Sequence, residues 1–187
     1  DSCEEYDGTS WTAGGAFPKA NRQQVGIGTQ TAGIGCGGYS TTNETESYEY
    51  DGTSWASLTE MNTARYTFAG AGEQTAGLVW GGYSPGAITT TEKYDGSSWT
   101  ASPASLNTAI AQQASANASS TSNATLSFGG TPPTTAATEK YNLSINTITP
   151  GAWASGTSIN TARNSFGGFG LQTANIIAGG YGTPNVK

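Results

Sequence analysis

The side chains best suited to contact a ligand are arginines and tyrosines that recur at fixed positions. Arg65 and Arg163 each end an Asn-Thr-Ala-Arg motif, and three tyrosines directly follow a Gly-Gly pair, namely Tyr39, Tyr83 and Tyr181. Tyr and Arg are the usual residues of binding hot spots, and aromatic rings suit the faces of sugars. We therefore treat these five as candidate ligand-binding residues. The alternative is that they are structural and bridge neighbouring repeats.

The residue types needed for common catalytic sites are missing. The chain contains no histidine, which excludes Ser-His-Asp and Cys-His catalysis and histidine-ligated zinc or copper sites. It also lacks a phosphate-binding glycine loop followed by lysine. We therefore predict no catalytic residue, no metal site and no cofactor.

The aspartates of three Tyr-Asp-Gly motifs are the remaining polar candidates: Asp7, Asp51 and Asp95. They could bind calcium, but Asp-Gly between two strand-like runs typically forms a hairpin turn. The motif is similar to the Asp box of sialidases, where Asp, Gly and Trp also lie at a hairpin. Here Asp and Gly are adjacent rather than separated, which argues against the alternative of a sialidase-like enzyme. A turn is the favoured interpretation.

An internal repeat positions all of these residues. Tyr-Asp-Gly-x-Ser-Trp begins at residues 6, 50 and 94, so it recurs every 44 residues. A fixed period of this length indicates an array of one supersecondary unit. We treat residues 1–187 as a single domain and divide it into the units 1–17, 18–61, 62–106, 107–159 and 160–187.

Each complete unit has the pattern of four short antiparallel strands. In the second complete unit the strand-like runs are Arg65–Gly72, Gln74–Gly82, Thr89–Tyr94 and Ser98–Ala101. No helical period of useful length occurs. A single unit cannot bury both faces, but units stacked around an axis cover one another, so the pattern predicts an all-β propeller. The recurring tryptophans should be buried between the blades: Trp11, Trp55, Trp99 and Trp153.

The order of Gly-Gly at 81–82, Glu-Lys-Tyr-Asp at 92–95 and Trp99 resembles the Kelch motif. In that family a Gly pair ends the second strand, and a Tyr and a Trp lie in the third and fourth strands. Three recurring motifs are similar to those in Kelch-like repeats of tailed bacteriophages, notably marine ones: Tyr-Asp-Gly-Thr-Ser-Trp, Asn-Thr-Ala-Arg and Gln-Thr-Ala. This resemblance implies a small Kelch-like β-propeller of about four blades. The third complete unit departs from the pattern at 117–125 and 141–153, where we expect longer loops.

The two ends of the chain carry complementary parts of a unit. Glu4–Tyr6 and the following Asp-Gly match a third strand and its turn, whereas Gly179-Gly180 follows a second strand. The first and last units can therefore complete one split blade, in which Glu4–Tyr6 pairs with the strand around Ile176–Gly180. Such pairing closes a ring and removes free edges. The alternative is an open array.

Composition and resemblance together restrict the partners. A net charge of −6 with only seven Lys and Arg argues against nucleic acid, and no apolar run is long enough for membrane insertion. Cys3 and Cys36 fall on different strands of different units, which does not favour a disulfide. The resemblance implies a non-enzymatic module on the virion surface that docks to other virion proteins or to host surface glycans. A homo-oligomer is compatible with the sequence, and a secreted carbohydrate-binding lectin of cellular origin is the alternative.

Overall fold

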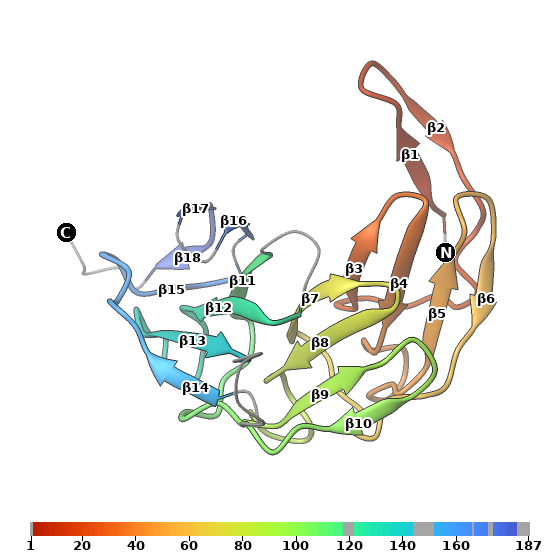
Figure 1. Cartoon of the computed structure of the whole chain (residues 1–187). Coiled ribbons are helices and arrows are strands. Elements are labelled where there is room, and N and C mark those ends of the chain that lie inside the picture. Colours follow the sequence, from red (N-terminus) through yellow and green to blue (C-terminus); the bar gives the residue numbers. More distant parts are fainter. Residues whose placement is uncertain (1, 118–121, 144–151, 166, 172–173, 183–187) are drawn as a thin grey trace.

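The computed structural model of this chain describes residues 2–117, 122–143, 152–165, 167–171 and 174–182. Within these ranges the protein is built from antiparallel strands and contains no helix (Figure 1). The all-β prediction is therefore confirmed for the described residues. The longer loops expected in the third complete unit lie largely at 118–121 and 144–151, outside these ranges.

Three sheets have four strands each, paired in chain order. Sheet 1 contains β3 (Val25–Thr29), β4 (Ala32–Cys36), β5 (Ser47–Tyr50) and β6 (Trp55–Ser57). Sheet 2 contains β7 (Ala69–Glu73), β8 (Ala76–Trp80), β9 (Thr91–Tyr94) and β10 (Trp99–Ala101). Sheet 3 contains β11 (Ala114–Asn117), β12 (Ala124–Phe128), β13 (Thr138–Asn142) and β14 (Ala152–Ser155).

Two hairpins flank these sheets. The N-terminal hairpin pairs β1 (Glu4–Tyr6) with β2 (Trp11–Ala13), and the C-terminal hairpin pairs β16 (Gly167–Leu171) with β17 (Ala174–Ala178). Two short strands, β15 (Arg163–Asn164) and β18 (Tyr181–Gly182), pair beside the C-terminal hairpin.

The Asp-Gly motifs form the hairpin turns that the sequence indicates. In sheet 2, Asp95 Oδ1 accepts hydrogen bonds from the backbone N–H groups of Ser97 and Ser98 at 2.9 and 2.8 Å. Gly96 takes a φ of 91°, which an L-residue with a side chain rarely adopts. Hydrogen bonds from Ser97 to this carboxylate hold its pKa at about 2. The Asp95 carboxylate therefore serves as the hydrogen-bond acceptor of its own turn.

The first strands of successive repeats lie side by side around a common axis. β3 packs beside β7, β7 beside β11, and β11 beside β16. A cavity of about 260 Å³ lies between β3, β7, β11 and β16. Each strand contributes two small or short residues to its lining: Val25 and Gly26, Ala69 and Gly70, Ala114 and Ser115, and Gly167 and Gly168. A Cβ on Gly70 would lie 2.6 Å from Val25 Cγ1, so glycine is needed for the strands to approach this closely.

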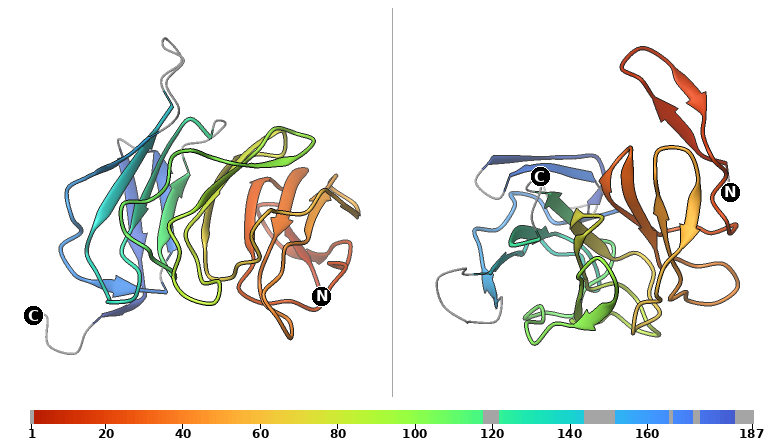
Figure 2. Two further views of the ribbon diagram at one scale, coloured as in Figure 1. Left: turned by 90° about the horizontal axis from the view of Figure 1, so that it is seen from below. Right: turned by 45° about the vertical axis from the view of Figure 1, so that its right-hand side comes forward.

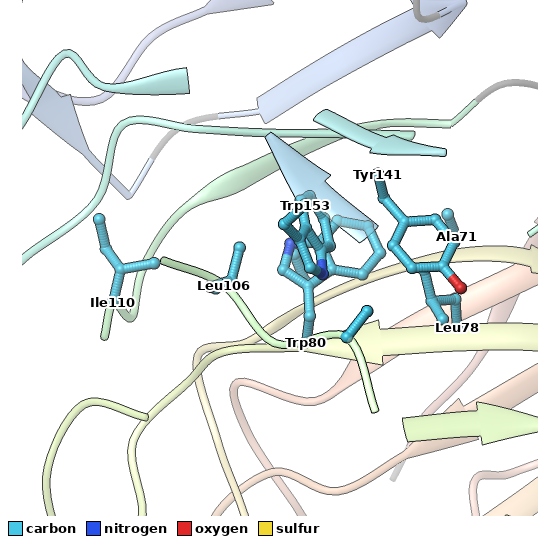
Figure 3. Packing of buried hydrophobic residues seen from close by; sticks show 9 residues of the cluster. Ala71, Leu78, Trp80, Leu106, Ile110, Tyr141 and Trp153 are labelled. Atoms are coloured by element: carbon cyan, nitrogen blue, oxygen red, sulfur yellow. The ribbon is translucent and has the colours of Figure 1, made fainter. Parts of the chain in front are cut away.

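The hydrophobic core lies between consecutive sheets. One buried cluster joins Leu78 and Trp80 of sheet 2 to Tyr141 and Trp153 of sheet 3, with the two tryptophan rings 5.2 Å apart (Figure 3). Another joins residues of sheet 1, including Ile34, to residues of sheet 2, including Trp99. Each four-stranded sheet therefore depends on its neighbours for burial.

The prediction of buried tryptophans is confirmed for Trp99 and Trp153, is met only in part by Trp55, and is wrong for Trp11. Trp99 and Trp153 are buried, Trp55 is half-buried, but Trp11 is 66% exposed. Trp11 lies on the N-terminal hairpin, which projects from the rest of the structure (right view of Figure 2). Its exposure does not come from a different pairing, because its pairing with Tyr6 repeats that of Trp99 with Tyr94.

The predicted closure within one chain is not present in the structure. β1 pairs with β2 in a separate two-stranded sheet, and β17 pairs with β16. The two hairpins lie at opposite sides of the array (Figure 1). The described residues thus form three four-stranded sheets and two terminal hairpins that do not pair with each other, rather than a closed ring.

Replacing Trp99 by Ala should lower the free energy of unfolding by about 3–5 kcal/mol, because it empties the layer between sheets 1 and 2. Trp11→Ala is the matched control, since the same repeat position is exposed there and should change stability by no more than about 0.5 kcal/mol. Urea titrations at low protein concentration measure both. Equal losses for the two variants would contradict the placement of the core between the sheets.

Candidate functional site

The chain enters each first strand through a residue in the left-handed conformation. These residues, which we call the axial rim, have φ between 51° and 59°: Gln23, Thr67, Gln112 and Ser165. None is glycine, so each carries a conformational cost of about 1–2 kcal/mol. They occupy one repeat position, and strained positions cluster where a fold builds a site. The axial rim is therefore a candidate functional feature.

Backbone hydrogen bonds explain why the rim keeps this conformation. Thr67 N–H donates to Gln23 O at 3.1 Å, Gln112 N–H to Thr67 O at 2.8 Å, and Ser165 N–H to Gln112 O at 3.1 Å. Each bond connects one repeat to the next around the axis. Among the described residues, no backbone hydrogen bond from Gln23 N–H to Ser165 O closes this series into a cycle. Three successive links thus place four equivalent residues around one opening.

A cavity of about 280 Å³ opens at this rim. All four rim residues line it, together with Gln24, Phe68 and Gln113 from the starts of the strands. The lining combines side-chain amides and hydroxyls with the apolar surface of Phe68 and its neighbours, and no charged group is among these residues. Such neutral donors and acceptors suit a polar, uncharged ligand.

A tyrosine row lies immediately outside the rim. Tyr39, Tyr66 and Tyr83 stack in sequence, with ring centroids 5.3 and 5.4 Å apart. The Arg22 guanidinium lies 5.0 Å from the centre of the Tyr39 ring, which is within cation–π range. Backbone bridges join Arg22 to Tyr39 and Tyr66 to Tyr83, so the link after each Gly-Gly pair lies against the entry to a first strand.

The predicted tyrosines therefore fall on the predicted side of the sheets, but not in one continuous ring. Tyr83 is 38% exposed and Tyr39 is half-buried. Tyr181 is 77% exposed and takes the same repeat position through its pairing with Asn164. The equivalent pairing in the third complete unit is Ala111 with Thr131, which interrupts the row.

The predicted arginines do not lie in the row. Arg65 is fully buried, and its Nη2 lies 2.7 Å from Glu92 Oε1, while Nη1 donates to Gly81 O and Thr90 O. Burial lowers the pKa of this guanidinium, and Glu92 opposes that effect. In this position Arg65 braces the sheet and presents no surface to a ligand. Arg163 is half-buried and donates from Nη1 to Gly179 O.

Sequence reasoning missed the rim and the middle of the tyrosine row. Tyr66 directly follows Arg65, and its contribution becomes visible only when the turn conformation is known. Aligning the repeats shows a polar residue at each rim position, but small and polar residues fill much of this chain. That compositional background hides the signal.

Other site chemistry is sparse among the described residues. They contain no group of three or more His, Cys, Asp or Glu side chains placed to hold a metal ion. No helix long and apolar enough to cross a membrane occurs in them. Cys3 and Cys36 are free thiols, and burial raises the pKa of Cys36 to about 12.

Comparison with known proteins does not assign this chain: no family model and no curated protein sequence matches it. The interpretation as a Kelch-like phage repeat therefore stays a prediction.

Glu92→Ala should cost about 3–5 kcal/mol of stability, because it leaves the Arg65 guanidinium buried without its carboxylate. Arg65→Ile should cost less than half as much. It copies Ile110 of the next repeat, where Glu139 still accepts hydrogen bonds from the backbone of Asn107 and Thr108. Chemical denaturation measures both variants. A larger loss for Arg65→Ile than for Glu92→Ala would contradict the bracing role.

Proposed function

We propose that this chain is a non-catalytic interaction module, a small Kelch-like propeller domain of a phage virion appendage. We further propose that its axial face binds host surface glycans. The observation that carries the proposal is the tyrosine row beside an uncharged cavity at the axial rim, which is lined by amide and hydroxyl side chains and by Phe68. Docking to another virion protein is the competing outcome of the test below.

The chemistry of this face supports a glycan. Sugar rings combine apolar C–H faces with hydroxyl groups, and so require aromatic surfaces next to hydrogen-bond donors and acceptors. The row supplies exposed ring area at Tyr83, and the rim supplies amides at Gln23 and Gln112 and a hydroxyl at Thr67. Electrostatic steering contributes little, because the cavity lining is uncharged.

Each such contact should be weak alone. Appendages are present in several copies on a particle, and linked sites gain a high effective concentration once one of them is bound. Modest affinity per domain is therefore compatible with firm attachment to a cell. The phage assignment rests on the resemblance of the repeat motifs to those of phage Kelch-like repeats. The fold alone does not support it, since fold does not imply function.

A glycan array probed with residues 1–187, displayed multivalently on beads, tests the proposal. We expect binding to a limited set of host glycans, and Tyr83→Ala should weaken it at least about tenfold, as for a hot-spot aromatic. Tyr83→Phe keeps the ring and should retain most of the binding. Thr100→Ala is the control, because Thr100 is exposed on the outermost strand of sheet 2, away from the rim.

Two results would contradict this function. Equal glycan binding by the parent and by folded Tyr83→Ala would remove the tyrosine row from the site. No glycan binding, combined with capture of a purified virion protein that Tyr83→Ala abolishes, would assign the face to virion assembly instead.

A further inference from the structure

A cavity of about 150 Å³ lies in the third complete unit, between the entry to β11 and the link from β12 to β13. Its lining includes both buried and exposed residues, so it connects the interior of the unit with the surface. The buried residues are Ile110, Ser127, Gly129 and Glu139. The exposed residues are Thr108, Pro132, Pro133 and Ala137.

The corresponding place in sheet 2 is filled by an arginine side chain. Asn-Thr-Ala-Arg at 62–65 aligns with Asn-Thr-Ala-Ile at 107–110, so Ile110 takes the position of Arg65. Three acceptors hold the Arg65 guanidinium: Gly81 O and Thr90 O, each 2.9 Å from Nη1, and Glu92 Oε1, 2.7 Å from Nη2. Strand register places three cavity-lining residues at the positions of these acceptors, namely Gly129, Ala137 and Glu139.

The carboxylate in the cavity keeps the orientation that receives the guanidinium in sheet 2. Glu92 Oε2 accepts hydrogen bonds from Asn62 N–H and Nδ2 at 2.7 and 2.9 Å. Glu139 Oε2 accepts the same two bonds from Asn107 at the same distances. Glu139 Oε1 accepts a bond from Thr108 N–H at 3.2 Å. The third complete unit thus repeats the acceptor arrangement without the arginine.

The buried charge of Glu139 has no counter-ion within the chain. Only 8% of this residue is exposed, and it forms no ion pair with any lysine or arginine that the structure describes. A buried carboxylate without a counter-ion is unfavourable, so a cation that reaches it gains a strong interaction.

The carbonyl of Gly129 also differs from its equivalents. In the other units a side-chain N–H donates to the first carbonyl of the Gly-Gly pair: Asn21 to Gly37 O, Arg65 to Gly81 O and Arg163 to Gly179 O. Among the described residues, no side chain donates to Gly129 O. A donor that enters the cavity from outside therefore finds two kinds of acceptor, a carboxylate and a backbone carbonyl.

The size and lining of the cavity suit an arginine side chain. A cavity of about 150 Å³ can hold benzene, which is larger than a guanidinium group. Ile110, Pro132 and Pro133 supply apolar surface that can cover the methylene stem of an arginine. The planar fork of a guanidinium can donate to several acceptors at once, which the compact ammonium of lysine does less well.

We propose that this cavity binds the guanidinium group of an arginine side chain that a partner polypeptide presents. The guanidinium donates to Glu139 Oε1, Gly129 O and Ala137 O, as Arg65 does to the corresponding atoms of sheet 2. The stem of the arginine lies against Pro132 and Pro133. This site is separate from the tyrosine row and does not depend on glycan binding.

An NMR titration with three blocked amino acids tests the proposal. The probes are the Nα-acetyl amides of arginine, of lysine and of citrulline, the uncharged analogue of arginine. The arginine probe should shift the backbone amide signals of Asn107 and Thr108, which donate to Glu139. It should bind at least about tenfold more tightly than the citrulline probe, because its hydrogen bonds are charge-assisted, and more tightly than the lysine probe.

Sheet 2 supplies an internal control in the same spectra. The amides of Asn62 and Thr63 donate to Glu92, but Arg65 already fills that place. Their signals should therefore stay unchanged.

Two variants copy features of sheet 2 into the cavity. Ile110→Arg supplies the guanidinium from within the chain and should abolish binding of the arginine probe. Ala137→Thr copies Thr90, whose Oγ1 accepts a hydrogen bond from Arg65 Nη2 at 3.0 Å, and should tighten binding several-fold. Because Ala137 is exposed, this second variant should fold like the parent even if Ile110→Arg does not.

Four results would overturn the inference. They are the absence of shifts at Asn107 and Thr108, equal affinity for the arginine probe and either other probe, unchanged binding by folded Ile110→Arg, and unchanged affinity of Ala137→Thr. Binding of the bare guanidinium ion as tightly as the arginine probe would assign the cavity to a small free cation, and would contradict the role of a partner polypeptide.

Discussion

Burial between consecutive sheets is the interaction on which this structure depends. A four-stranded sheet of this size has two faces, and neither is covered by its own strands. The clusters around Trp80 and Trp153, and around Ile34 and Trp99, each take residues from two successive sheets. Burying such side chains contributes about 1.5–3 kcal/mol each. The complete repeats are therefore stable only as an array, and a half-unit without a neighbour leaves its aromatic residues exposed.

Stacking imposes a second constraint, because backbones must meet where the sheets converge. Gly38, Gly82 and Gly130 each donate a backbone hydrogen bond to the link that enters the next repeat. Their positive φ values and close contacts require glycine. The same junctions bring Tyr39 and Tyr83 against the strand entries and form the axial rim. The candidate binding face is thus a consequence of how the sheets are joined.

The sequence predicts the repeated parts of the fold well and the particular contacts poorly. The 44-residue period and the Asp-Gly turns indicate four-stranded antiparallel units, because both signals are local. The exposure of Trp11 and the separation of the terminal hairpins are matters of long-range packing, which local signals do not determine. Arg65 matched a binding residue by type, but Glu92, 27 residues away, makes it structural. The rim depends on backbone conformation, which residue type alone does not reveal.

Amide hydrogen exchange, followed by NMR, tests most directly whether the sheets are joined around the axis as described. The N–H groups of Thr67 and Gln112, which link one repeat to the next, should exchange only on global unfolding. Those of Ser97 and Ser98, in an exposed hairpin turn, should exchange orders of magnitude faster. Exchange of all four at similar rates would show that the links between repeats do not persist, and would contradict this account.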